Sequence, residues 1–410
     1  MERFYKLLKK WQKYTGTDNV YLFENGLWLT MGRMLSIGAL FLLALAFANL
    51  LEPSVYGNYR YVLSLIAFLE IFSMSGLGTA VSQATARNFE GSFYTSFKVK
   101  LKWGILASCG AIAGAVYYWL QGNPALTLPL LLSAVFLPLM NAPKVYNDFL
   151  EGKKLFGAQV KYSTINMIIP VAALIAALFI TKNLFWLIAV FLASHTFSNY
   201  FFYLLTEIRF QPNKKEDPQT ISYGKHLSIM GAIGLIASQL DRILLFALMG
   251  PVALAVYYFA MAIPDQIRSF SKSIFTLVLP KFSAQSPEEI KRNMTKRSLQ
   301  LLFLASMMVF IYVISAPYVY KIFFPQYIDS IFYSQIYIFS LLTLPVGLMS
   351  LSFQAKAKKR ELYSLQITPF VQIVLLASLI PPFGIMGAFA AILASKVLGV
   401  ILTLILFRKF

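Results

Sequence analysis

Hydrophobic stretches of about 20 residues recur along this chain, and each is long enough to cross the ~30 Å hydrocarbon core of a bilayer as a helix. Apolar residues make up 58% of the 410 residues and charged residues only 13%, a balance that water-soluble globular proteins do not have. The sequence therefore predicts an all-α integral membrane protein with about twelve transmembrane helices. The expected spans are approximately 26–50, 59–86, 102–121, 126–147, 161–181, 184–206, 223–249, 252–280, 297–317, 331–354, 364–382 and 384–407.

The distribution of basic residues between these spans predicts the topology. Of the 36 Lys and Arg residues, 27 lie on the N-terminal tail and on alternate loops, whereas the opposite loops hold only Arg60, Lys182 and Lys321. Because basic residues accumulate on the cytoplasmic side, both termini are expected in the cytoplasm, with residues 1–25 as a basic interfacial tail. The net charge of +19 is thus explained by topology, and nucleic acid is not expected as a partner.

The chain is expected to consist of two halves of six helices each, residues 1–206 and 223–410. The polar segment 207–222 between them, which contains QPNKKEDPQT, is expected to be a flexible cytoplasmic linker and the hinge between the halves. Two short patterns occur once in each half. LEPSVYGNY from Leu51 is similar to GPVALAVYY from Gly250, and the region after Phe149 is similar to the region after Phe353. A parallel internal repeat of this kind is typical of transporters, whose substrate site lies between the repeats.

Three of these features together resemble a known family. They are the twelve spans, the Leu-x-Pro-x-x-Tyr-Gly-x-Tyr segment from Leu51 with its counterpart at Gly250, and the Asp241-Arg242 pair inside the seventh span. In these respects the chain is similar to polysaccharide-export and O-antigen type lipid-linked oligosaccharide flippases of the multidrug/oligosaccharidyl-lipid/polysaccharide (MOP) superfamily. The resemblance implies a cell inner membrane protein that moves an undecaprenyl-diphosphate-type glycan for O-antigen, exopolysaccharide or capsule synthesis. It also implies membrane lipids, glycosyltransferases and a glycan polymerase as partners.

Basic residues within the spans are the candidate substrate site. Charged side chains are costly at this depth and persist where they face a protein interior or a water-filled cavity. A cationic cavity suits an anionic ligand, and arginine suits phosphate because its planar fork donates two hydrogen bonds at once. The alternative is that these charges only pair internally, Asp265 with Arg268 and Glu70 with Arg33. The residues expected to bind the diphosphate head group are Arg33, Arg242, Arg268, Lys272 and Lys396.

Acidic residues within the spans are candidates for coupling transport to an ion gradient. Glu70, Asp241 and Asp265 could bind Na⁺ or H⁺, with Asp241 the first choice and a salt bridge to a neighbouring cation as its alternative. His195 in the sixth span could relay protons or be a hydrogen-bonded structural residue. No catalytic residue, metal site or cofactor is expected.

Two other functions stay open at this point. A cation-coupled multidrug or metabolite antiporter of the same superfamily would favour a cavity dominated by Asp and Glu. A membrane glycan polymerase or ligase would need a large external loop with catalytic residues, whereas the expected external loops are short. The sequence contains no phosphate-binding loop, HExxH motif or nucleophile elbow, so the chain is predicted not to be an enzyme. Its single cysteine excludes an intrachain disulfide.

Overall fold

The computed structural model describes residues 19–356 and 358–408, with side chains for all of these except 19–31, 33, 270–281, 283, 284 and 359. Almost all of the described chain is helical, and no strand occurs in it, which confirms the predicted fold class. The helices are α2 (Asn19–Leu50), α3 (Pro53–Leu69), η1 (Glu70–Ser73), α4 (Leu77–Ala86), α5 (Ser92–Leu120), α6 (Pro124–Asn141), η2 (Ala142–Lys144), α7 (Val145–Gly152), α8 (Phe156–Ile180), α9 (Leu184–Phe210), α10 (Thr220–Ala284), α11 (Pro287–Phe323), η3 (Pro325–Tyr327), α12 (Ser330–Tyr337), η4 (Ile338–Thr343), α13 (Leu344–Ala355), α14 (Lys359–Leu365) and α15 (Ile367–Arg408).

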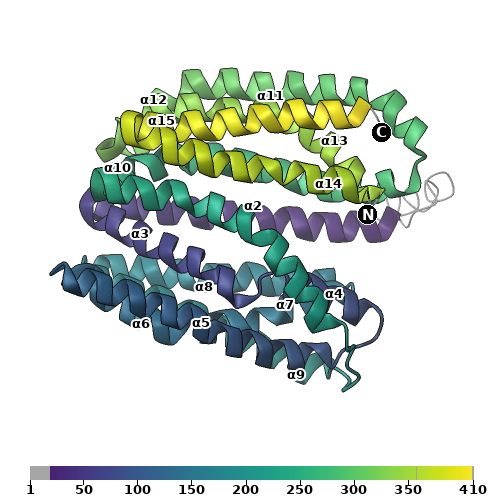
Figure 1. Cartoon of the computed structure of the whole chain (residues 1–410), viewed down its shortest axis with the longest axis horizontal. Helices are drawn as coiled ribbons and strands as arrows, with labels where there is room; N and C mark the ends of the chain where they lie inside the picture. Colours follow the sequence, from purple (N-terminus) through teal and green to yellow (C-terminus); the bar gives the residue numbers. More distant parts are fainter. Residues whose placement is uncertain (1–18, 357, 409–410) are drawn as a thin grey trace.

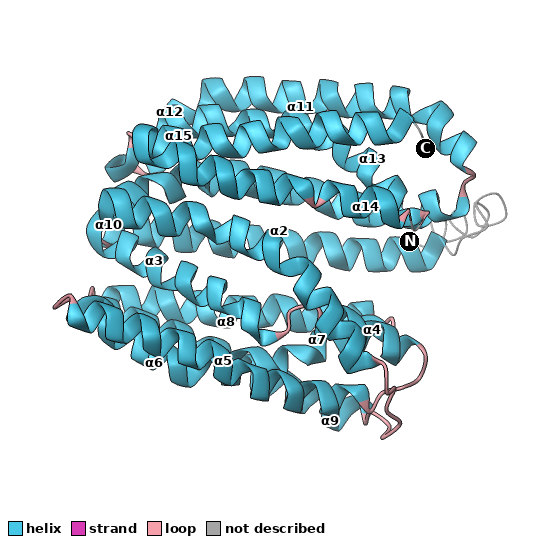
Figure 2. Ribbon diagram, viewed as in Figure 1, coloured by secondary structure: helices cyan, strands magenta, loops and turns pink. Residues whose placement is uncertain are grey.

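The helices form two groups that meet along α2 and α10 (Figure 1). Helices α3 to α9 lie on one side and α11 to α15 on the other, and nearly all of them run roughly parallel or antiparallel to one long direction (Figure 2). The beginning of α2, the end of α15 and the loop after α9 all lie at the same end of the molecule. Helix α10 packs against both groups, with α3 and α4 on one side and α12, α13 and α15 on the other.

Within the described part, eight helices are long and apolar enough to cross a membrane, or up to nine if the bent pair Pro53–Ser73 and Leu77–Ala86 is one span. This is fewer than the twelve expected, because α10 and α15 are each two helices joined at a sharp break, at Gly250 and Gly384, and because Met34–Leu50 of α2 is counted only as a shorter apolar helix. Both glycines have positive φ, +80° and +55°, a conformation that side chains with a Cβ rarely adopt. Twelve passes and cytoplasmic termini stay predictions.

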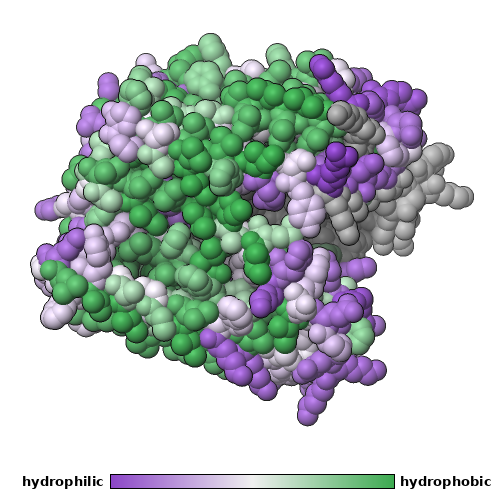
Figure 3. Space-filling view, viewed as in Figure 1, coloured by the Kyte–Doolittle hydropathy of each residue, from purple (hydrophilic) through white to green (hydrophobic). Residues whose placement is uncertain are grey.

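Apolar side chains cover the outer face of the helices. Figure 3 shows a broad hydrophobic band across the middle of the visible face and hydrophilic residues gathered mainly at its ends. Ile180, Phe303 and Phe310 are among the large apolar side chains that are mostly exposed. Exposed apolar surface of this extent is far larger than a soluble monomer carries, so lipid must cover it. The chain is a multi-pass membrane protein.

The two similar sequence patterns from Leu51 and Gly250 touch each other in the structure. A Cβ atom built on Gly57 of α3 would lie only 1.8 Å from the carbonyl oxygen of Pro251 in α10. No side chain fits there, since the obstacle is backbone. Aromatic rings flank this crossing, including Tyr61 stacked on Phe246 with ring centroids 3.7 Å apart. The backbones of α3 and α10 therefore pack directly against each other at Gly57 and Pro251. Only glycine at position 57 allows this close approach.

Replacing Gly57 by alanine is expected to force α3 and α10 apart and to lower stability by about 1–3 kcal/mol or more, as overpacking in a tight interior does. Thermal unfolding of the purified protein in detergent micelles measures this. Gly231→Ala is the matched control, because no atom lies within 4 Å of a Cβ at that helical position. Equal melting temperatures for the two variants would contradict the tight crossing.

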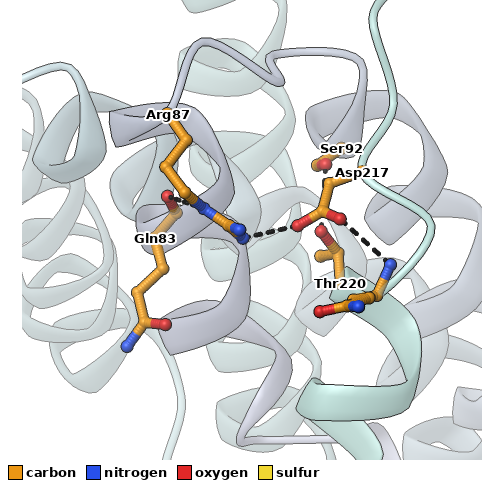
Figure 4. Close-up of polar contacts among 6 residues, drawn as sticks. Gln83, Arg87, Ser92, Asp217 and Thr220 are labelled. Carbon is orange, nitrogen blue, oxygen red and sulfur yellow. Dashed lines mark hydrogen bonds and ion pairs between the residues drawn. The ribbon is translucent and has the colours of Figure 1, made fainter.

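The segment expected to be a flexible hinge is held firmly against the first half. Only residues 211–219 lie outside helices, and this loop packs on the turn between α4 and α5 (Figure 4). Arg87 donates a 2.5 Å hydrogen bond to the carboxylate of Asp217, whose side chain is only 7% exposed. The N–H of Gly91 donates to the carbonyl of Lys215 at 2.8 Å, and the hydroxyl of Thr95 donates to Glu216 at 2.6 Å. The start of α10 is thus fastened to the first half.

Replacing Asp217 by alanine is expected to release this loop, because a hydrogen bond to a charged group contributes ~1.5–3 kcal/mol. Lys214 and Lys215 are exposed and give trypsin a place to cut once the loop opens. The initial rate of cleavage after these lysines should rise roughly tenfold or more relative to the wild-type protein. Glu151→Ala, which removes an exposed carboxylate on α7, should leave the rate unchanged. A flexible linker would instead be cut equally fast in all three proteins.

Candidate functional site: a cationic cavity between the halves

A cavity of about 570 Å³ lies between the two groups of helices. Helices α2, α3, α8 and α9 contribute its walls on one side, and α10 and α11 on the other. Most of the lining is apolar, from Leu, Ile, Met, Val and Phe side chains. The ionisable side chains that line it are Arg60, His195, Arg242 and Asp265. The cavity expected from the internal repeat is therefore present in the described part of the chain.

Two arginines from opposite halves share one aromatic ring in this cavity. The guanidinium of Arg60, on α3, lies 4.4 Å from the ring centroid of Tyr258, and that of Arg242 lies 4.9 Å from the same centroid. Arg60 also donates a 2.7 Å hydrogen bond from Nε to the hydroxyl of Tyr56. Ser64 and Tyr258 are joined through their hydroxyls at 2.9 Å. An aromatic face stabilises a desolvated cation, so the ring holds both guanidinium groups at the interface.

Arg242 keeps part of its hydrogen-bonding capacity unused. Its NH1 donates to Gln239 at 2.8 Å, but its Nε is buried and has no hydrogen-bond partner among the described residues. A buried donor without a partner loses the free energy of its lost hydration, about 1–3 kcal/mol. A ligand that accepts a hydrogen bond here would recover it.

A second charged cluster lies further along α10 and is centred on Tyr337. The hydroxyl of Tyr337 donates to the carboxylate of Asp265 at 2.8 Å and lies beside the guanidinium of Arg268. The ammonium group of Lys396 lies 5.0 Å from the centroid of the Tyr337 ring. Helices α10, α12 and α15 thus bring Asp265, Arg268 and Lys396 around one tyrosine.

Three cavities follow one another along α10. Asp265 and Gln266 border both the central cavity and a neighbouring cavity of about 450 Å³, and Arg268 borders that neighbour and a third cavity of about 350 Å³. The third cavity lies within the second half and also includes Lys396. A charged path therefore leads from the interface between the halves into the second half.

A sequence profile for the family described as polysaccharide biosynthesis protein matches residues 46–332, which is more than half of the chain. The chain belongs to this family. The match confirms the family resemblance seen in the sequence. No curated protein sequence matches this chain.

Solved structures show that this polysaccharide biosynthesis protein has the fold of MOP superfamily transporters. It is similar to a multidrug resistance MATE family transporter in an inward-facing conformation, with a TM-score of 0.68 and 14% identity over 94% of this chain and 97% of that chain. The outward-facing conformation of a MATE family transporter gives 0.64 at 14% identity, over 94% of each chain. A MOP superfamily transporter from Pyrococcus furiosus, described by a reversed polarity of its binding pocket, gives 0.62 at 13% identity, over 94% and 95%.

The predicted cationic residues of this family member divide into separate groups. Arg242 lies in the central cavity, and Arg268 and Lys396 lie around the third cavity. The side chains of Arg33 and Lys272 lie outside the described residues. The structure thus places Arg242 apart from Arg268 and Lys396, and the binding of a diphosphate head group by these residues stays a prediction.

The three acidic candidates occupy three different environments. Asp265 borders the central cavity. Asp241 is buried and accepts hydrogen bonds from the hydroxyl of Tyr257 and from the backbone N–H of Arg242, the latter at 2.8 Å. Glu70 lies outside the cavity lining and pairs with Lys144 at 3.2 Å. Their role in ion coupling stays a prediction. Within the described part of the chain, no group of three or more His, Cys, Asp or Glu could hold a metal ion.

Sequence reasoning placed Arg60 outside the candidate site. It was counted among the basic residues of the external side, because it follows the loop at Leu51 to Asn58 directly. The structure starts α3 at Pro53, so Arg60 is already two turns inside the helix. The signal was available in the sequence, since Pro is favoured in the first turn of a helix and Tyr56, Tyr59 and Tyr61 surround Arg60.

The shared ring of Tyr258 is expected to stabilise both arginines. Tyr258→Leu removes two cation–aromatic contacts and should lower stability by about 1–3 kcal/mol, whereas Tyr258→Phe keeps the ring and should cost less than about 1.5 kcal/mol. Unfolding in detergent micelles measures both variants. A double-mutant cycle of Tyr258→Leu with Arg60→Gln should give a coupling of at least ~0.5 kcal/mol. Strictly additive effects would show that the guanidinium and the ring do not interact.

Proposed function

We propose that this chain is a flippase that carries a polyprenyl-diphosphate-linked oligosaccharide across the cytoplasmic membrane by alternating access. The observation that carries the proposal is the placement of Arg60 and Arg242, from opposite halves, over one tyrosine ring in the central cavity. Neither arginine takes part in an ion pair among the described residues. Two guanidinium groups in this arrangement suit an anionic ligand.

A diphosphate head group fits this arrangement chemically. Arginine presents parallel N–H groups that match phosphate oxygens, and hydrogen bonds between charged partners are about twice as strong as neutral ones. The apolar walls of the cavity exclude water and so strengthen the attraction. Because the arginines belong to different halves, a bound diphosphate links the halves, and its release allows them to separate. Binding and conformational change are coupled in this way.

The lipid tail can remain in the membrane beside α2. Ile37 and Leu40 of α2 line the central cavity, while Leu35 and Leu42 on the same helix are exposed to lipid. A single helix therefore separates the cavity from the bilayer. A prenyl chain is as apolar as these side chains. It can therefore stay in the lipid, with no cost in hydrophobic free energy, while the head group occupies the cavity.

In this proposal glycosyltransferases supply the lipid-linked glycan on the cytoplasmic side and a glycan polymerase receives it on the other. The chain itself makes and breaks no covalent bond. Asp265 is the acidic candidate best placed for Na⁺ or H⁺ coupling, because it borders the cavity and lies on the same helix as Arg268.

A cation-coupled multidrug antiporter is the second candidate, favoured by the similarity of the fold to MATE family transporters. A cationic drug would need an acidic partner in the cavity. Asp265 supplies one carboxylate there, whereas Arg60 and Arg242 supply two positive charges. The charge balance of the cavity favours the anionic substrate.

The test is a flipping assay with Arg60→Gln, Arg242→Gln and the double variant in proteoliposomes that contain a fluorescent prenyl-diphosphate-linked oligosaccharide. Each lost charge-assisted contact should slow flipping roughly tenfold or more, since such contacts contribute ~1.5–3 kcal/mol. Lys98→Gln with Lys102→Gln, an exposed pair one turn apart on α5, is the matched control and should flip at the wild-type rate.

Flipping at the wild-type rate by the double variant would refute the diphosphate site. Uptake of a cationic dye against a Na⁺ or H⁺ gradient, lost in Asp265→Asn but retained in the arginine variants, would instead establish the antiporter.

A further inference from the structure

The third cavity, called the chamber below, is a partly open pocket whose lining comes only from the second half. It has a volume of about 350 Å³ and is formed by α10, α13, α14, α15 and the end of η4. Among its described lining residues, the charged ones are Arg268 and Lys396, both positive. Asp265, the nearest acidic residue described above, faces the central and the neighbouring cavities.

Three of the four hydroxyl groups that line this chamber, all except that of Thr368, already use their hydrogen within the protein. The hydroxyls of Thr343, Ser350 and Thr403 donate to backbone carbonyls of Ser340, Val346 and Gly399, at 2.8, 3.1 and 2.7 Å. Because each hydroxyl has one hydrogen, these three present only acceptor lone pairs to the chamber. An anion in the chamber would therefore be held by Arg268 and Lys396, which come from different helices. The acceptor oxygens around them suit hydroxyl groups of a ligand.

Tyr337 fixes the geometry of this chamber. Its ring lies beneath the ammonium group of Lys396 and its hydroxyl is bonded to Asp265, next to Arg268. The ring is 5% exposed and so is held by the surrounding helices. The two cations are thus positioned by one rigid side chain.

We propose that this chamber is a second anion site that binds a phosphate group. Resting on the proposed function, it is the inner station at which the head group is held before it reaches Arg60 and Arg242. Ten residues of α10 separate Arg268 from Tyr258, which is about 15 Å along a helix. Arg268 borders both the chamber and the cavity that leads to the centre, so a phosphate can pass from one station to the other beside a guanidinium.

The experiment measures phosphate binding to the purified full-length protein, independently of transport. Inorganic phosphate at low ionic strength should raise the unfolding temperature of the wild-type protein in a concentration-dependent way. Lys396→Gln should weaken the apparent Kd at least tenfold, and Lys396→Arg should stay within about threefold of the wild-type value. These comparisons are made in an Arg60→Gln, Arg242→Gln background, which lacks the proposed central site, and Lys98→Gln, which is exposed, should keep the Kd of that background.

A second variant protects the test against misfolding. Thr403→Leu fills the chamber with a larger apolar side chain and leaves both cations in place, so it should weaken phosphate binding as Lys396→Gln does. If neither variant weakens phosphate binding in the background that lacks the central site, the chamber is not the phosphate site and the proposal is overturned.

A short prenyl diphosphate, farnesyl diphosphate, distinguishes the two sources of phosphate. Binding at least tenfold tighter than that of inorganic phosphate, with the advantage lost in Lys396→Gln, would identify the carried lipid as the ligand. Equal binding of both compounds would identify free phosphate. If the Arg60 and Arg242 variants lose flipping but Lys396→Gln binds phosphate normally, the chamber is refuted and the flippase is supported. If the Arg60 and Arg242 variants flip normally but Lys396→Gln loses phosphate binding, the chamber is supported and the flippase is refuted.

Discussion

The structure depends on how positive charge is accommodated inside an apolar bundle. A guanidinium or ammonium group in a membrane interior needs a partner that replaces water. Here the partners are mostly tyrosines: Tyr258 and Tyr56 for Arg60, Tyr258 again for Arg242, and Tyr337 for Lys396. A tyrosine face stabilises a cation without neutralising it. The positive charge of these side chains is therefore kept inside the bundle.

The described residues show two different solutions to buried charge in the two halves. In the first half, Lys144 pairs with Glu70 and Lys100 lies 3.8 Å from Asp148, so those charges are compensated within the half. At the interface and in the second half, the cations rest on aromatic rings. The contrast separates a structural use of charge from one that suits ligand binding. It also explains why Glu70, although acidic and within a predicted span, lies away from the cavity.

Much of the fold could be predicted because hydrophobic length and basic-residue distribution act locally along the chain. Gly250-Pro251 was read correctly as a turn, since only glycine tolerates that backbone and proline favours the start of the next helix. The site was harder to predict. Arg268 and Lys396 are 128 positions apart, and nothing in the sequence states that both face Tyr337. The loop 211–219 was misread because its composition is typical of flexible linkers, whereas its acidic residues have basic and hydroxyl partners on α4 and α5 that only the fold brings near.

The contact of Gly57 with Pro251 has a mechanical consequence. Two helices whose backbones touch at one point can rotate about that point with little change in their contacts. Sliding one helix along the other would instead bring atoms into steric clash. The loop 211–219 fastens the near end of α10 to the first half, so the far end at the glycine crossing is where α10 can turn. We expect the glycine crossing to behave as a fulcrum: the part of α10 before Gly250 stays with the first half, and the part after Gly250 tilts with the second half.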